Sequence, residues 1–132
     1  MIVFRTRYLP LKPYAAMAFG YVLLLKRGVR LTPSLLRHET IHWHQCRELL
    51  VVPFYVWYLL EWAIRFLQVG LQRCARQKAH KDSRLRQSLA RQAYFNIAFE
   101  REAYAHQNDP TYLCRRPFWA FCSYLRSAKK RA

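Results

Sequence analysis

The chain has 132 residues, the length of one domain, so a second independent domain is not expected within residues 1–132. Hydrophobic residues make up 53% of it, which is enough to form a core. The 23 Lys and Arg against 7 Asp and Glu give a formal charge of +16, which predicts attraction to nucleic acid or to an anionic membrane surface. The four cysteines form no CxxC pair, which argues against a disulfide framework and for reduced thiols.

The N-terminal region contains an apolar run over residues 15–25 that superficially resembles a signal peptide. The run ends in Lys26, Arg27 and Gly28 rather than in small residues suited to cleavage, so we expect no signal peptide. Residues 14–25 are rich in strand-forming residues and lie between Pro13 and Gly28, which predicts a short β-hairpin. Together with the reduced thiols, these features predict a location in the cytoplasm or at the cytoplasmic face of a membrane.

A helix is predicted to begin at residue 33. The hydroxyl of Thr32 can cap its first turn, and Pro33 suits the first helical position. Leu35, Leu36 and Ile41 then begin an apolar face. The stretch RHETIHWHQC, residues 37–46, therefore lies inside this helix.

A second helix is predicted from Pro53, and the apolar stretch 49–71 is about long enough to span a bilayer. Glu61 and Arg65 interrupt it at the i, i+4 spacing of an ion pair. Because charges within a membrane are costly, we favour a buried amphipathic helix over one that spans or lies on a membrane.

The remainder of the chain is also predicted to be helical. Residues 72–91 are strongly basic and form either a solvated segment or a positive flank of a membrane helix. A third helix is predicted from Asp82 or Ser83 to His106, followed by a short aromatic helix over residues 118–125. The expected fold class is therefore mainly α (α+β), a small helical domain with an N-terminal β-hairpin.

The HETIH motif at residues 38–42 carries the chemistry. On a helix, His38 and His42 lie one turn apart on one face, close enough to bind a single Zn²⁺. Glu39 projects beside them, where it can act as a general base on a water molecule. Such a site needs a third protein ligand and an open position for water.

The best candidate for the third ligand is Glu100. It shares a helical face with Ala93, Ile97 and Ala103, where a lone carboxylate is costly unless something pairs with it. Glu102 lies on a different face and is the second candidate. Glu61 is third because Arg65 already explains it.

Other donors and residues are less suited to the metal. Cys46 follows His42 by one more turn, but a core thiol is the favoured interpretation. His44 points away from the pair, and His80 and His106 are expected at the surface. Tyr104, one turn beyond Glu100, is a candidate donor to the oxyanion of a hydrolysed carbonyl.

HETIH with the later FEREAY resembles the gluzincin clan of zinc metallopeptidases, above all the small minigluzincins. The resemblance implies zinc bound by His38, His42 and Glu100, with a peptide or protein as substrate. It departs at Tyr104, where an acid that orients a histidine is usual. Thermolysin-like members place their glutamate at a distance comparable to that of Glu61. The longer pattern also resembles a family of short uncharacterised bacterial proteins.

If the site is catalytic, the residues permit hydrolysis of a peptide bond by zinc and Glu39, with the substrate extended along a strand edge at residues 21–25. Two alternatives stay open at this point. One is a zinc ion that only joins helices in a membrane-associated protein. The other is a basic helical nucleic-acid-binding protein, whose arginine-rich segment 72–91 contacts phosphates.

Overall fold

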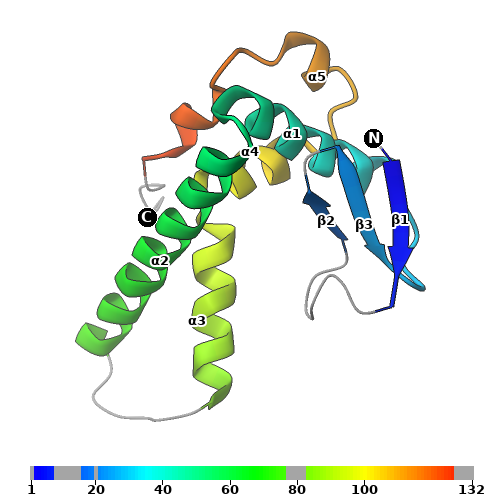
Figure 1. Ribbon diagram of the computed structural model, residues 1–132. Coiled ribbons are helices and arrows are strands. Elements are labelled where there is room, and N and C mark those ends of the chain that lie inside the picture. Colours follow the sequence, from blue (N-terminus) through cyan, green and yellow to red (C-terminus); the bar gives the residue numbers. More distant parts are fainter. Residues whose placement is uncertain (1, 8–15, 20, 77–82, 127–132) are drawn as a thin grey trace.

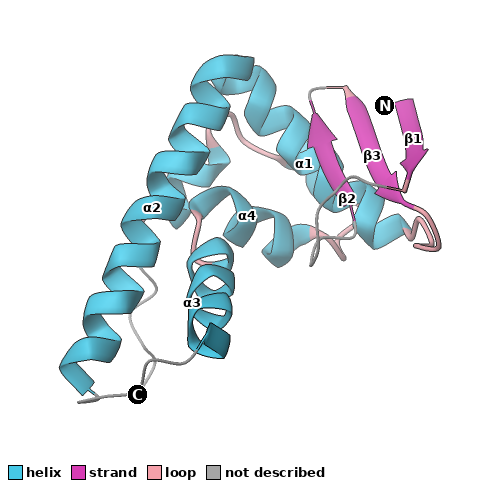
Figure 2. Cartoon of the chain, turned by 60° about the horizontal axis from the view of Figure 1, so that its bottom comes forward, coloured by secondary structure: helices cyan, strands magenta, loops and turns pink. Residues whose placement is uncertain are grey.

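The computed structural model describes residues 2–7, 16–19, 21–76 and 83–126, and in places only their backbone. Helices dominate, and a small sheet stands at one end of the molecule (Figures 1 and 2). The predicted class, mainly α with a small β element, is confirmed.

The sheet has three strands, β1 (Ile2–Thr6), β2 (Ala16–Phe19) and β3 (Val22–Lys26), in the order β1-β3-β2. The pair β2 and β3 is antiparallel and forms the predicted hairpin, whereas β1 was not predicted and pairs in parallel with β3. Since β3 is the central strand, both of its edges are already paired. The prediction that residues 21–25 offer a free edge to a peptide is therefore wrong.

Helix α1 (Pro33–Leu49) begins where the capping pattern predicts. The Thr32 hydroxyl accepts a hydrogen bond from the backbone N–H of Leu35 at 3.1 Å. The helix ends at Leu49, and the residue after it, Leu50, has a φ of 67°, which is unusual for a residue with a side chain. The chain bends there by 111° into α2.

Helix α2 (Val51–Arg76) begins slightly before the predicted Pro53. The predicted ion pair exists, with Arg65 Nη2 3.1 Å from Glu61 Oε1, and both side chains are buried. Only one face of α2 is covered, and many apolar side chains on the other face are exposed. Within the described ranges no single helix meets a length and hydropathy criterion for crossing a membrane, but the bent pair of α1 and α2 meets it jointly.

The predicted third helix is two helices, α3 (Ser83–Phe95) and α4 (Ala98–His106), separated at Asn96 and Ile97. The break has a tertiary cause. Glu61 Oε1, on α2, accepts a hydrogen bond from the backbone N–H of Ala98 at 3.1 Å and so caps the first turn of α4. Asp82, the alternative start, lies outside the described residues.

Helix α4 packs on α1 and against the C-terminal segment, which contains α5 (Tyr112–Arg115) and a 3-10 helix η1 (Ala120–Tyr124). The latter replaces the helix predicted over 118–125, and α5 was not predicted. The larger core cluster lies where α1, α2, α4 and η1 meet: Cys46, Phe54, Ile97, Phe99 and Phe121. Cys46 is thus a core thiol, as favoured from the sequence.

Candidate metal centre

Two helices bring the predicted ligands together. Helix α1 turns His38, Glu39 and His42 inward, and α4 lies against it and presents Glu100. The Nε2 atoms of His38 and His42 are 3.1 Å apart. The Glu100 carboxylate lies 3.1 Å from His42 Nε2 through Oε1 and 3.4 Å from His38 Nε2 through Oε2. All three side chains are buried.

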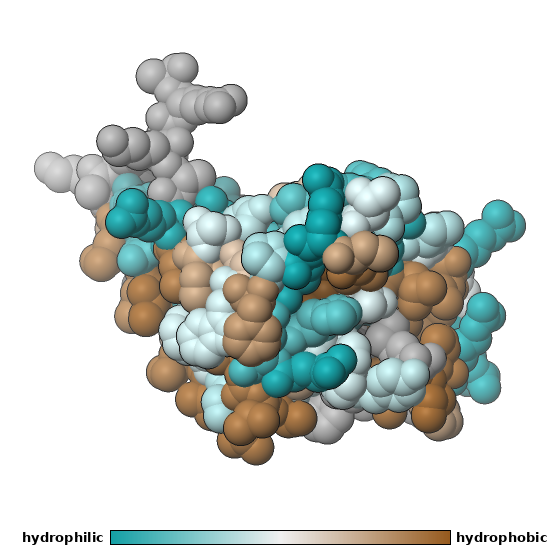
Figure 3. Space-filling model, turned by 90° about the horizontal axis from the view of Figure 1, so that it is seen from above, coloured by the Kyte–Doolittle hydropathy of each residue, from teal (hydrophilic) through white to brown (hydrophobic). Residues whose placement is uncertain are grey.

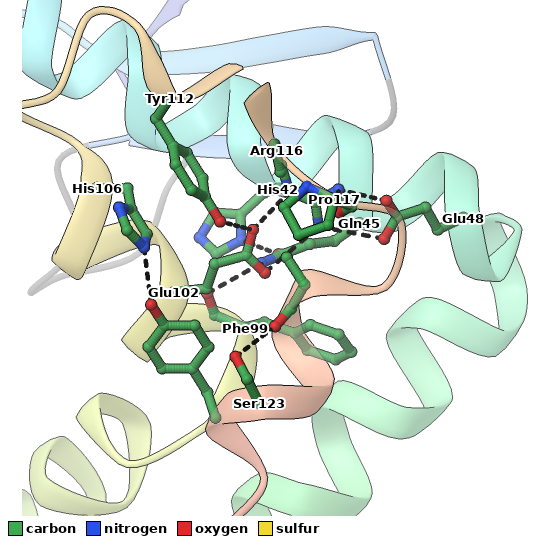
Figure 4. A network of polar contacts seen from close by, with 12 residues as sticks. His42, Gln45, Glu48, Phe99, Glu102, His106, Tyr112, Arg116, Pro117 and Ser123 are labelled. Atoms are coloured by element: carbon green, nitrogen blue, oxygen red, sulfur yellow. Dashed lines mark hydrogen bonds and ion pairs between the residues drawn. The ribbon is translucent and has the colours of Figure 1, made fainter. Parts of the chain in front are cut away.

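Gln45 determines which nitrogen of His42 carries a proton. Its Nε2 donates to the Phe99 carbonyl at 3.1 Å and to Glu102 at 3.0 Å, so its Oε1 is the atom that faces His42. That Oε1 lies 2.8 Å from His42 Nδ1 and can only accept, so Nδ1 must hold a hydrogen. In the neutral imidazole, Nε2 then presents its lone pair to His38 and Glu100. Figure 4 shows Gln45 between His42 and Glu102.

The lone pair of His42 Nε2 and the Glu100 carboxylate therefore point toward the same place. This arrangement favours a positive charge between them. Without a metal, that charge is a proton. Burial disfavours a charged His42, but the Glu100 carboxylate more than offsets this and raises the pKa of His42 to about 9. Burial would likewise raise the pKa of Glu100, yet the histidines hold it well below its usual range.

The hydrogen bonding of the Glu100 carboxylate also fits a cation. Glu100 Oε1 accepts a hydrogen bond from the Tyr58 hydroxyl at 2.7 Å, whereas the buried Oε2 has no hydrogen-bond partner among the described residues. One ligand atom from each of His38, His42 and Glu100 lies within 4.8 Å of the other two. This group could hold a metal ion, for which Oε2 and the two Nε2 atoms are the available donors.

The other predicted residues of the site lie beside this group. Glu39 is buried on α1, and its negative charge contributes to the raised pKa of His42. The Tyr104 ring packs edge-on against the His38 ring, with centroids 4.6 Å apart, and is 40% exposed. Burial and the charge of Glu100 raise the pKa of Tyr104, so its phenol stays protonated and can donate a hydrogen bond.

The alternative ligands have other roles. Glu102 is fully buried and binds Arg116, Tyr112 and Gln45 (Figure 4). Arg116 also pairs with Glu48 of α1, so this network ties the C-terminal segment to both helices.

Glu61 pairs with Arg65 and caps α4 instead. Neither carboxylate belongs to the His38, His42 and Glu100 group.

The remaining histidines differ in part from expectation. His106 was predicted at the surface but is half-buried, with Nε2 2.7 Å from the Tyr124 hydroxyl and its ring stacked on Tyr112. His44 is half-buried outside the group. His80 lies outside the described residues.

Sequence reasoning missed three residues that support the site: Gln45, Tyr58 and Arg116. Gln45 could have been found, because it lies one turn after His42 on the same inward face of the helix. Tyr58 and Arg116 left no such signal, since each meets its carboxylate only through the packing of separate segments. His38 Nδ1 has no hydrogen-bond partner in the described part of the chain, so no counterpart of Gln45 orients this second histidine.

Comparison of the chain with protein-family models, with curated proteins and with solved structures found no match.

Replacement of Gln45 tests the support of His42. We expect Gln45→Leu to lower the affinity for a divalent metal by about 10–100-fold, because the similar-sized side chain no longer orients the imidazole. Competition with a chelator measures the affinity, and circular dichroism verifies the fold. His44→Ala, on the same helix, serves as the control and should bind metal as the wild type does. Unchanged affinity in Gln45→Leu would contradict this role.

Proposed function

We propose that the chain is a zinc-dependent metallopeptidase that hydrolyses peptide bonds. The observation that carries this proposal is the convergence of His38 Nε2, His42 Nε2 and an unpartnered Glu100 oxygen, with Glu39 buried beside them. The resemblance of HETIH and FEREAY to the gluzincin metallopeptidases supports it independently of the distances.

The donor set favours zinc over Mg²⁺ and Ca²⁺. Two imidazoles and one carboxylate, with a fourth position left for water, form a catalytic zinc set, whereas Mg²⁺ and Ca²⁺ prefer oxygen ligands alone. Four-coordinate zinc with bonds of about 2.0–2.1 Å separates neighbouring ligand atoms by about 3.3 Å. The separation of 3.1 Å between the two Nε2 atoms and that of 3.4 Å between His38 Nε2 and Glu100 Oε2 agree with that value.

Each residue then has a role. His38, His42 and Glu100 would hold the zinc ion, which would supply a water of lowered pKa and polarise the scissile carbonyl. Glu39 takes the proton of the attacking water and passes it to the leaving amine. The protonated Tyr104 donates a hydrogen bond to the developing oxyanion. Gln45 and Tyr58 hold His42 and Glu100 in position.

The small sheet is the proposed place for the substrate. Among the described strands β2 pairs only with β3, so its other edge has no strand partner there, and β2 contacts α1, which carries His38 and His42. An extended peptide can add to such an edge through main-chain hydrogen bonds. A peptide or protein substrate is therefore proposed to lie along β2.

Cleavage of a general protein substrate tests this function. We expect the zinc-loaded protein to cleave dye-labelled casein, to lose this activity with 1,10-phenanthroline and to regain it when zinc is added back. Absence of cleavage by protein that holds one zinc ion per chain would refute the peptidase and leave the metal site intact.

A second candidate is a zinc ion that only joins α1 to α4. The near-complete burial of the three ligands favours it, because structural zinc sites are closed to solvent. In that case the chelator lowers the unfolding midpoint and no peptide is cleaved. A nucleic-acid-binding function gains no such support, because within the basic segment 72–91 residues 77–82, and the side chains of residues 75–76 and 83–88, lie outside what the structure describes.

A further inference from the structure

Helix α2 exposes a continuous row of aliphatic side chains. Each of these residues is between 52% and 71% exposed. We call this row the apolar stripe: Val52, Val56, Leu59, Leu60, Ile64, Leu67 and Leu71. At 100° and 1.5 Å per residue, it covers roughly 140° of the helix circumference over about 29 Å. A contiguous exposed apolar surface rather than scattered apolar residues marks a site of interaction.

The charged residues of the same helix lie on the opposite face. From Val51 to Gln72, Glu61 and Arg65 are the only charged residues, and both are buried against the rest of the fold. These two charged residues thus face inward while the aliphatic residues of the stripe face outward, the reverse of a water-exposed helix. The inward face is covered by α3 and by contacts with the C-terminal segment, which leaves only one side of α2 for an apolar environment.

The apolar surface continues past the stripe. A groove of about 630 Å³ runs beside it, lined mainly by apolar side chains, and reaches Leu125 of the C-terminal segment. Figure 3 shows brown, hydrophobic side chains gathered along the lower and left margin of the molecule, beside teal side chains over its centre.

Leu50, at the corner before α2, is a second exposed apolar feature next to the stripe. Leu50 has φ 67° and ψ 157°, a conformation that glycine adopts without strain, yet this leucine is 70% exposed. An exposed leucine in strained backbone gains little from packing within the described chain. Leu50 directly precedes α2, two residues before the stripe begins at Val52.

The charge of the chain indicates which kind of partner can cover the apolar stripe. With a formal charge of +16, two copies of the chain repel each other, which disfavours a second copy on the stripe. Nucleic acid is unsuited too, because the stripe offers no cation to a phosphate. Exposed Arg47 precedes the corner, and exposed Arg126 follows Leu125 of the groove, so positive charge borders the apolar surface. An anionic lipid bilayer matches both properties.

We propose that the apolar stripe of α2 docks on the surface of an anionic lipid bilayer, with the helix lying in the plane of the interface. Apolar side chains enter the boundary between headgroups and acyl chains, while basic side chains contact anionic headgroups. This attachment does not depend on the proposed peptidase activity.

Vesicle binding tests the docking surface. We expect the wild type to co-sediment with phosphatidylcholine vesicles that contain phosphatidylglycerol, and less with vesicles of phosphatidylcholine alone. The double variant Leu60→Gln, Leu67→Gln keeps the charge and the helix propensity. It should lower the partition coefficient about tenfold or more for each leucine removed from the lipid.

Two further variants sharpen the test. Phe4→Gln removes an equally exposed apolar side chain from β1, at the other end of the molecule (Figure 1), and should bind vesicles as the wild type does. Leu50→Gly should weaken vesicle binding without lowering the unfolding midpoint, because the glycine relieves the strained corner.

Three results would overturn the proposal. The wild type could stay in the supernatant with both kinds of vesicle, or the double variant could bind as tightly as the wild type. Sedimentation could instead show a wild-type dimer that the double variant abolishes, without vesicle binding, which would make a second copy the occupant. Circular dichroism and zinc content establish that the double variant is folded in each case.

Discussion

The variant His42→Ala is expected to lose almost all of the bound zinc, while the purified wild type holds about one ion per chain. His42 Nε2 faces both other ligands at 3.1 Å, and its orientation is held by Gln45. Loss of a residue that hydrogen-bonds to a ligand typically lowers metal affinity by 10–100-fold. Loss of a ligand itself should therefore lower the affinity by more than about 100-fold. Elemental analysis after dialysis against a weak chelator measures the content.

The control for this variant lies on the same helix. His44→Ala removes a half-buried imidazole outside the group and should retain zinc. Because His42→Ala leaves the buried Glu100 charge poorly paired, Glu100→Gln provides a second variant. It keeps the size of the side chain and an acceptor for Tyr58 but removes the anionic ligand. Full zinc content in both His42→Ala and Glu100→Gln would exclude the proposed metal centre.

The variant Glu39→Gln is expected to keep its zinc and to lose peptide cleavage. The amide has nearly the size of the carboxylate but cannot accept the proton of the attacking water. General-base catalysis contributes about 10²–10⁴-fold, so the rate of cleavage should fall by that factor. The measurement pairs cleavage of dye-labelled casein with elemental analysis of the same preparation.

The zinc content and the cleavage rate of Glu39→Gln together distinguish two roles of Glu39. A variant that loses both zinc and cleavage would show that Glu39 supports the metal centre and would leave its role as a base unproved. A variant that holds zinc and cleaves at the wild-type rate would contradict the assignment of Glu39. In that event the structural role of zinc becomes the better explanation of the site.

Variants of the ligands, of Glu39 and of the apolar stripe test the three proposals separately. Zinc content responds to the ligands, cleavage responds to Glu39, and vesicle binding responds to the apolar stripe. The apolar stripe lies on α2, whereas Glu39 and the proposed ligands lie on α1 and α4, so vesicle binding and zinc content can fail independently of each other; cleavage additionally requires the zinc. Failure of vesicle binding would therefore not weaken the assignment of the metal centre.

Local sequence patterns accounted for the features that a single segment specifies. The cap at Thr32 set the start of α1, and the i, i+4 spacing placed His38 and His42 on one face. The apolar neighbours of Glu100 indicated that its carboxylate is buried and needs a partner, which the structure bears out through contacts to both histidines. Each of these features depends only on helix geometry and the nature of the side chains.

Tertiary structure alone decided the rest, because it depends on contacts between segments far apart in the sequence. It showed that Glu102 is held by Arg116, and that of the three candidate carboxylates Glu100 is the one that faces both histidines. It broke the predicted third helix at Ile97, where Glu61 caps α4 from another helix. It also left the leucines of α2 exposed, because helical periodicity shows which residues share a face but not which face the rest of the chain covers.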